Sequence, residues 1–159
     1  MSFMITRPGK SRLILSSPVM AAAGTFGYGN IYTDMVDYSK VGAIITNPVT
    51  LSPRLPANGP RMVQLDAGVL VHTGLPNAGL SRTIKEWRPR WEKMTTQVVL
   101  HLVATTIDDV QRAMSMIDTV DCIAAVELGL NDDIIADDAA DFTHAAVRAG
   151  EKPVIVRLP

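Results

Sequence analysis

Cysteine is almost absent from this 159-residue sequence, which contains Cys122 alone. A single cysteine excludes an internal disulfide framework and is typical of proteins that stay in the reducing cytoplasm. Neither sign of charge is in excess, because 15 Lys and Arg residues stand against 16 Asp and Glu residues. This balance gives no basic surface of the kind that binds nucleic acid or an anionic membrane, so neither partner is expected.

Long apolar runs are missing as well. No stretch approaches the ~18 apolar residues that a membrane-spanning helix needs. The N-terminus lacks the long apolar segment of a signal peptide, so we expect a soluble cytoplasmic protein. His72, His101 and His144 are too scattered for a recognisable metal-ligand spacing, and no metal site is expected.

Apolar side chains make up 47% of the sequence, enough for the core of a single domain over residues 1–159. They are concentrated in short runs that are nearly continuous, a pattern typical of strands buried on both faces of a parallel sheet. The predicted strands are 18–22, 41–46, 97–103, 122–128 and 153–158.

Helical periodicity separates the later strands. Residues 107–117 place their apolar side chains on one face, and Thr106 precedes them as a candidate N-cap. Residues 137–149 repeat this design and end before Gly150, which is suited to the C′ position. A third helix is expected over 80–93, interrupted by Pro89, with Trp87 and Trp91 packing it against the sheet. Alternating strands and helices at this spacing indicate right-handed βαβ units on a parallel sheet.

The segment 47–77 breaks this pattern. It contains five prolines, so it is predicted to be mostly loop. A long loop inside a compact domain is usually functional, and loops after barrel strands form the active-site face.

Local motifs leave several alternatives open. The glycine-rich segment 22–29 suits a tight turn or a loop that faces a cofactor, and its order is neither a P-loop nor a dinucleotide-binding fingerprint. His101 lies in an apolar strand, which favours a core or barrel-lumen histidine. The pairs Asp132-Asp133 and Asp137-Asp138 suit paired catalytic carboxylates or turn and helix-entry residues, and the second interpretation is favoured. Composition and spacing therefore indicate a parallel α/β domain without naming a reaction.

The order of four segments is more specific. Residues 17–29 (SPVMAAAGTFGYG), 41–54 (VGAIITNPVTLSPR), 59–79 (with AGVLVHTGLPNAG) and the strands at 125–128 and 153–158 resemble, in sequence and order, the class 1 dihydroorotate dehydrogenases. The resemblance implies a (β/α)8 barrel. Since such a barrel typically needs ~250 residues, we expect a partial barrel of about five parallel strands with intervening helices.

The same resemblance implies FMN as cofactor, a small-molecule substrate and a role related to pyrimidine biosynthesis, in which dihydroorotate is oxidised to orotate. The family's cofactor-binding positions fall here on Ala22, Ala23, Gly24, Asn47, His101, Gly129 and Arg157. Its substrate-binding positions fall on Val71, His72, Thr73, Gly74 and Leu75, and its catalytic base falls on Asp132.

Most of these positions depart from the family pattern. Asn47 replaces a lysine and so removes a positive charge beside the flavin, while Val71 replaces an asparagine and cannot hydrogen-bond a pyrimidine through its side chain. A site that loses such a pairing loses ~10⁴ or more in substrate discrimination. Two functions remain: a divergent FMN-linked oxidoreductase, or an inactive partial-barrel subunit or scaffold. In either case we expect a homo-oligomer, or pairing with another chain across the open sheet edges.

Overall fold

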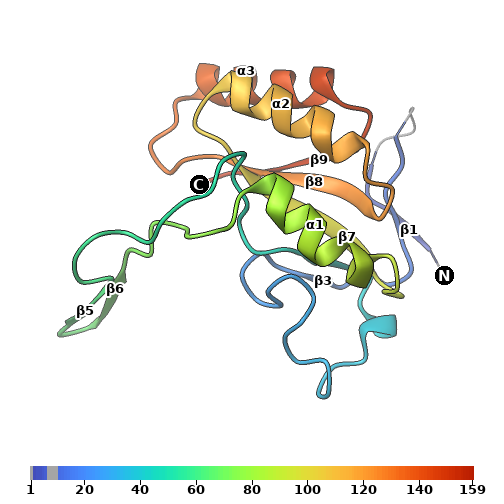
Figure 1. Ribbon diagram of the computed structural model, residues 1–159, viewed down its shortest axis with the longest axis horizontal. Helices are drawn as coiled ribbons and strands as arrows, with labels where there is room; N and C mark the ends of the chain where they lie inside the picture. The colour runs from blue at the N-terminus through green and yellow to red at the C-terminus, as the bar shows by residue number, and fades with distance from the viewer. Residues whose placement is uncertain (1, 7–10) are drawn as a thin grey trace.

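The computed structural model describes residues 2–6 and 11–159 and contains one five-stranded parallel sheet (Figure 1). The strands follow the order β3-β4-β7-β8-β9, so each strand pairs with its predecessor in this series. Their bounds are β3 Met20–Ala21, β4 Ala43–Ile45, β7 Gln97–Val103, β8 Ile123–Gly129 and β9 Val154–Arg157. All five predicted strands are confirmed.

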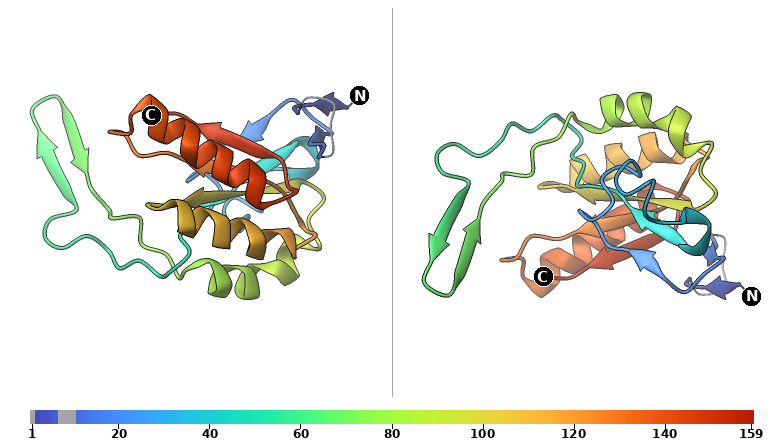
Figure 2. Two further views of the ribbon diagram at one scale, coloured as in Figure 1. Left: turned by 90° about the horizontal axis from the view of Figure 1, so that it is seen from above. Right: turned by 90° about the horizontal axis from the view of Figure 1, so that it is seen from below.

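The central strands are buried on both faces, which explains their nearly continuous hydrophobicity. Alternate residues of β7 enter two different cores: Leu100 packs in the cluster shared with the helices, whereas Val99 packs in a second cluster. The second cluster lies on the inner face and includes Leu13 and Leu15. With helices covering only the outer face, the sheet forms the partial barrel that the sequence predicts (Figure 2).

Three helices follow the sequence pattern: α1 Leu80–Trp91, α2 Ile107–Asp118 and α3 Ala136–Ala149. The predicted N-cap is confirmed, because the Thr106 hydroxyl accepts a hydrogen bond from the Asp109 N–H at 3.1 Å. Pro89 does not interrupt α1, since it stands in the last turn, where its missing N–H costs one hydrogen bond.

Gly150 corrects one prediction. It does not adopt the left-handed C′ conformation, because its φ of −148° is extended backbone. A Cβ at this position would lie 3.0 Å from a carboxylate oxygen of Asp118 and from the Met114 methyl group. A larger residue at 150 would therefore require the Asp118 and Met114 side chains to move slightly, and Asp118 also accepts hydrogen bonds from the Glu151 and Lys152 N–H groups.

Two antiparallel hairpins were not predicted. The first pairs β1 Phe3–Met4 with β2 Ile14–Leu15, and a short 3-10 helix, Tyr38–Lys40, follows later in the chain. The second corrects the loop predicted over 47–77: β5 Met62–Leu65 pairs with β6 Gly68–Val71. This second hairpin projects from the body of the molecule, and all eight of its strand residues are exposed (Figures 1 and 2).

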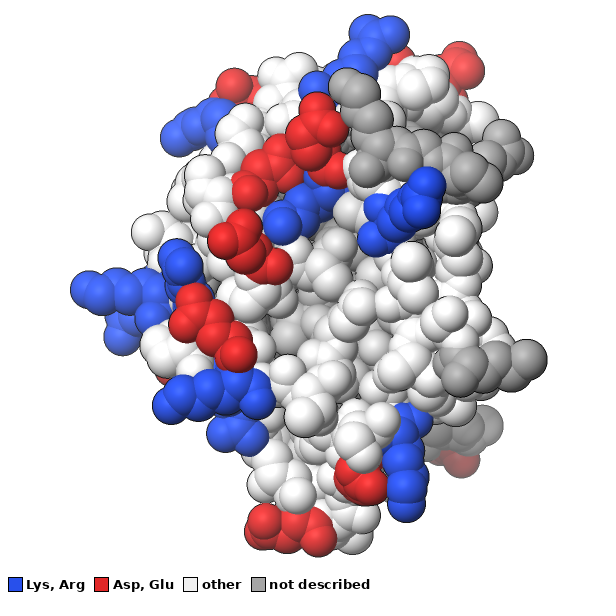
Figure 3. Space-filling view, turned by 90° about the vertical axis from the view of Figure 1, so that its right-hand side faces the viewer, with Lys and Arg blue, Asp and Glu red and all other residues white. Residues whose placement is uncertain are grey.

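The surface shows no concentration of one charge on the face seen in Figure 3, where acidic and basic side chains lie close together. Within residues 2–6 and 11–159, no helix combines the length and apolar character needed to span a bilayer.

Candidate functional site

A cavity of about 320 Å³ lies at the carboxyl ends of β7, β8 and β9. The parallel register brings these strand ends together, because Val103 of β7 pairs with Gly129 of β8, and Gly129 pairs with Arg157 of β9. Five residues that the sequence assigned to the site line this cavity: Leu75, His101, Gly129, Asp132 and Arg157. Pro48, Val103 and residues 130–131 and 158–159 complete the wall.

His101 is the most buried ionisable residue in this wall. It is 3% exposed, and its Nδ1 lies 2.6 Å from Oε1 of Glu127, its register partner on β8. The His101 backbone N–H donates to the Thr46 hydroxyl at 3.1 Å, which connects β7 to the end of β4. His101 is thus a buried histidine with a hydrogen-bonded partner, in agreement with the interpretation as a core or barrel-lumen residue.

Gly129 is required by the His101 ring. An ideal Cβ at Gly129 would come within 2.8 Å of the ring's Cε1 and 2.9 Å of Nε2. Such contacts would push the imidazole out of its position against Glu127. The absence of a side chain at 129 thus sets the shape of the cavity floor.

Asn77 holds the segment that brings Leu75 to the cavity. Its side-chain oxygen accepts hydrogen bonds from the Thr50 N–H at 3.2 Å and the Gly79 N–H at 2.9 Å, and its amide donates to the Leu75 carbonyl at 2.9 Å. Gly74, with φ of +76°, approaches Ala57 so closely that a Cβ would lie 2.7 Å from the Ala57 nitrogen. These contacts fix the path of residues 74–77 across the carboxyl ends of the strands.

The remaining predicted site residues do not line the cavity. Val71 belongs to the projecting hairpin and is 58% exposed, and His72 and Thr73 follow it at the surface. Asn47 comes directly before Pro48 of the cavity wall, and its N–H donates to the Gly27 carbonyl at 2.8 Å. Ala22, Ala23 and Gly24 form a turn after β3, two strands away from β7.

Helix α1 fastens the glycine-rich turn. The Trp91 indole N–H donates to the Tyr28 carbonyl at 2.9 Å, and Arg90 Nε donates to the Gly29 carbonyl at 2.8 Å. The Trp87 ring stacks on the Tyr28 ring at a centroid distance of 5.3 Å. The predicted packing of both tryptophans against the barrel is confirmed.

Sequence reasoning missed Glu127 and Thr46 as site residues. Glu127 is an acidic residue inside an otherwise apolar strand and is 8% exposed, so its position alone was a usable signal for a buried pair. Thr46 carries no comparable signal, because threonine is common in buried strands.

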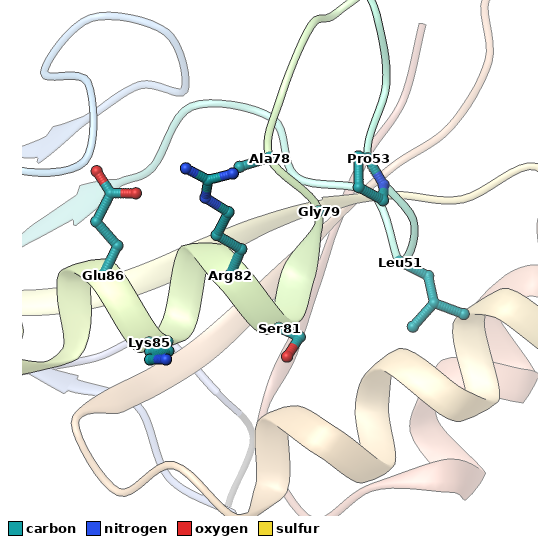
Figure 4. A pocket seen from close by; sticks show the side chains of 8 residues that line it. All are labelled: Leu51, Pro53, Ala78, Gly79, Ser81, Arg82, Lys85 and Glu86. Atoms are coloured by element: carbon teal, nitrogen blue, oxygen red, sulfur yellow. The ribbon is translucent and has the colours of Figure 1, made fainter.

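A second cavity, of about 740 Å³, is larger but lies elsewhere, beside the start of α1 (Figure 4). It is bounded by Leu51, Pro53 and the first turns of α1, where Arg82 and Glu86 stand apart from Ser81 and Lys85. None of the predicted site residues lines it. Because barrel active sites form at the carboxyl ends of the strands, we assign the candidate site to the smaller cavity.

Other reactive groups give no competing site. In the part of the chain that the structure describes, no three His, Cys, Asp or Glu side chains are grouped to hold a metal ion. Burial raises the pKa of the Cys122 thiol, which lowers the fraction of reactive thiolate.

Comparison with known proteins places these features in a family. Residues 11–131 match the family described as dihydroorotate dehydrogenase. The catalytic subunit of dihydroorotate dehydrogenase B (NAD(+)) from Desulforamulus reducens is 31% identical over 157 residues, covering 92% of this chain and 52% of that protein. Its counterpart from Bacteroides thetaiotaomicron is also 31% identical, with the same coverage.

A solved structure supports the fold. The crystal structure of the Eimeria tenella dihydroorotate dehydrogenase, in complex with ferulenol, superposes with a TM-score of 0.59 at 17% identity. The match covers 92% of this chain and 50% of that one. The chain therefore spans about half the length of the relatives it matches.

Proposed function

The chain belongs to the dihydroorotate dehydrogenase family, and from this premise we propose that it forms one side of an FMN-linked oxidoreductase site. The observation that carries the proposal is the cavity at the carboxyl ends of β7, β8 and β9, which collects five residues at family site positions. We further propose that the substrate is a small molecule other than dihydroorotate.

The residues present are compatible with a flavin. Gly24, with φ of +85°, has open space where a Cβ would stand, so its backbone is accessible to a flat ligand. His101 and Arg157 contribute hydrogen-bond donors to the cavity wall. Gly24, Asn47, His101 and Arg157 are the residues that would hold FMN. When bound, FMN accepts a hydride from a substrate.

The chain's own residues would bind and shield the ligand. The Arg157 guanidinium carries a positive charge and would stabilise negative charge on a ligand. Pro48 and Leu75 cover part of the cavity with apolar atoms and would reduce the access of water. Asp132 supplies an exposed carboxylate at the rim as a candidate base.

The proposal of a different substrate rests on Val71. Its apolar side chain occupies the family's first substrate-asparagine position and lies on the exposed hairpin, away from the cavity. A carboxylated pyrimidine would lose that hydrogen bond, which weakens discrimination for dihydroorotate strongly.

FMN binding gives a direct test. We expect excess FMN to stabilise the purified chain, by about 2.7 kcal/mol at a concentration 100 times the Kd, with a matching rise in melting temperature. The variant Arg157→Met should bind FMN at least several-fold more weakly, whereas Arg148→Met, on the exposed surface of α3, should bind it normally. A colourless protein whose melting temperature does not respond to FMN would contradict the proposed FMN site. Rapid reduction of the bound flavin by dihydroorotate would contradict the proposal of a different substrate.

A second candidate function, an inactive subunit or scaffold, is favoured by the β5–β6 hairpin. A two-stranded hairpin is at best marginally stable alone in water, yet this one exposes Val63, Leu65 and Leu70 by 44%, 54% and 60%. An apolar surface of this kind marks an interaction site. This function predicts that the hairpin is covered in a homo-oligomer.

Light scattering tests the subunit function. The wild-type chain is expected to be a dimer or larger, and the double variant Val63→Asp/Leu70→Asp, which changes one register pair, is expected to be a monomer. The control Ser115→Asp adds charge to the exposed face of α2 and should leave the oligomer intact. A wild-type monomer across the micromolar range would eliminate this function.

A further inference from the structure

His101 and Glu127 form a buried ionisable pair at the cavity. They stand opposite each other on β7 and β8, with Nδ1 and Oε1 2.6 Å apart, and neither side chain is more than 10% exposed. A carboxylate removed from water is stable only when its charge is compensated. Within residues 2–6 and 11–159, Glu127 makes one ion pair, and its partner is His101. Contact with the His101 ring therefore compensates the buried carboxylate.

The short contact also determines which ring nitrogen is available. Because the Glu127 carboxylate accepts, Nδ1 of His101 carries the hydrogen and donates it, which leaves Nε2 for another partner. Among the residues that the structure describes, the His101 ring makes one hydrogen bond, through Nδ1. Nε2 lies beside Gly129, where no side chain separates it from the cavity that both residues line.

Among the residues that line the cavity, His101 is the buried ionisable one. Asp132 and Arg157 are the other ionisable groups of the cavity wall, and both are exposed. Thr46 follows the neighbouring strand β4, and its hydroxyl accepts a hydrogen bond from the His101 backbone N–H. A threonine hydroxyl is not an acid or base at ordinary pH.

We propose that His101 exchanges a proton, through Nε2, with a carbonyl or carboxylate oxygen of a ligand in this cavity, and that Glu127 is its positioning residue. In the forward direction the ligand's O–H bond breaks, its electron pair stays on the oxygen, and an N–H bond forms on the free Nε2 of His101. The hydrogen bond between Nδ1 and Glu127 is kept throughout. No electrons are transferred in this step and no further reactant is needed. The inference deepens the proposed function and depends on it only for the presence of a ligand.

Proton counting during FMN binding is the first test. Calorimetry in two buffers of different ionisation enthalpy measures the protons exchanged when FMN binds the full chain. We expect a non-zero exchange in the wild type and a smaller one in His101→Asn, whose FMN affinity is measured in the same titration. Glu127→Gln should reduce the exchange, and His144→Asn, on the exposed part of α3, should not change it. FMN binding without proton exchange in the wild type would overturn the inference.

Nitrogen-15 NMR of the histidine rings provides a test that needs no ligand. With signals assigned through the His101→Asn and His144→Asn variants, we expect the Nε2 resonance of His101 to shift in Glu127→Gln, because Nδ1 then loses its carboxylate partner. An Nε2 resonance that is the same in the wild type and in Glu127→Gln would overturn the inference. If FMN does not bind while the NMR response appears, the proposed function fails and the proton-exchanging pair stands.

Discussion

Replacing His101 with leucine is expected to lower the free energy of unfolding by about 3–5 kcal/mol, because the substitution leaves a buried carboxylate without its partner. Glu127 is 8% exposed, so solvent cannot compensate its charge. The His101 ring, with Nδ1 2.6 Å from the Glu127 carboxylate, provides this compensation. Urea unfolding followed by circular dichroism measures the change from the shift in midpoint.

A double variant separates the loss of charge compensation from the loss of packing. Adding Glu127→Met to His101→Leu removes both charges and keeps similar volumes, and we expect it to return the stability to within about 1 kcal/mol of the wild type. His144→Leu, at an exposed position, should change stability by no more than about 0.5 kcal/mol. A double variant as unstable as the single one would show that packing, and not the unpaired carboxylate, dominates.

Replacing Trp91 with alanine is expected to cost about 3–5 kcal/mol of stability, as for other large aromatic side chains removed from a core. Trp91 is 2% exposed and packs among the residues between α1 and the sheet. It also donates the hydrogen bond that holds the Tyr28 carbonyl, so its loss should loosen the glycine-rich turn and weaken FMN binding further.

Trp91→Phe provides the matched control. It retains most of the apolar surface but cannot donate to Tyr28, so we expect a cost of about 1 kcal/mol from the hydrogen bond in addition to that of the smaller ring. Thermal and urea unfolding of both variants give the comparison. If alanine and phenylalanine were equally destabilising, the hydrogen bond to the turn would account for most of the effect and the packing argument would be wrong.

The sheet and helices were predictable because they depend on local patterns. The continuous apolar runs of β7 and β8 follow from burial on two faces, and the start of α2 follows from the Thr106 cap. The β5–β6 hairpin was not predicted, because the five prolines of segment 47–77 indicated a loop. Its strands also lie outside the buried parallel sheet, so they lack the continuous apolar runs of that sheet. Gly150 was misread because its small size serves a contact with α2, which only the tertiary structure reveals.

The site was predictable only in part, for a related reason. His101 could be placed in the core or the barrel lumen from its strand neighbours. Its partner Glu127 is 26 residues away, and the two meet only because the parallel register of β7 and β8 sets them opposite each other. The resemblance brought together positions 71–75 as one substrate segment, whereas the structure leaves Val71 on the projecting hairpin and takes Leu75 to the cavity.

The base of that hairpin segment is closed by a single antiparallel bridge, in which the Arg54 N–H donates to the Asn77 carbonyl at 3.0 Å and the Asn77 N–H returns a bond to Arg54 at 3.1 Å. The segment between them therefore leaves and re-enters the barrel at one point. Loop-closure entropy rises only slowly with length, so an insertion held in this way can grow, shrink or be exchanged at little energetic cost. The bridge therefore fixes both ends of residues 55–76, so a change in the length of the projecting hairpin need not alter the register of the barrel strands.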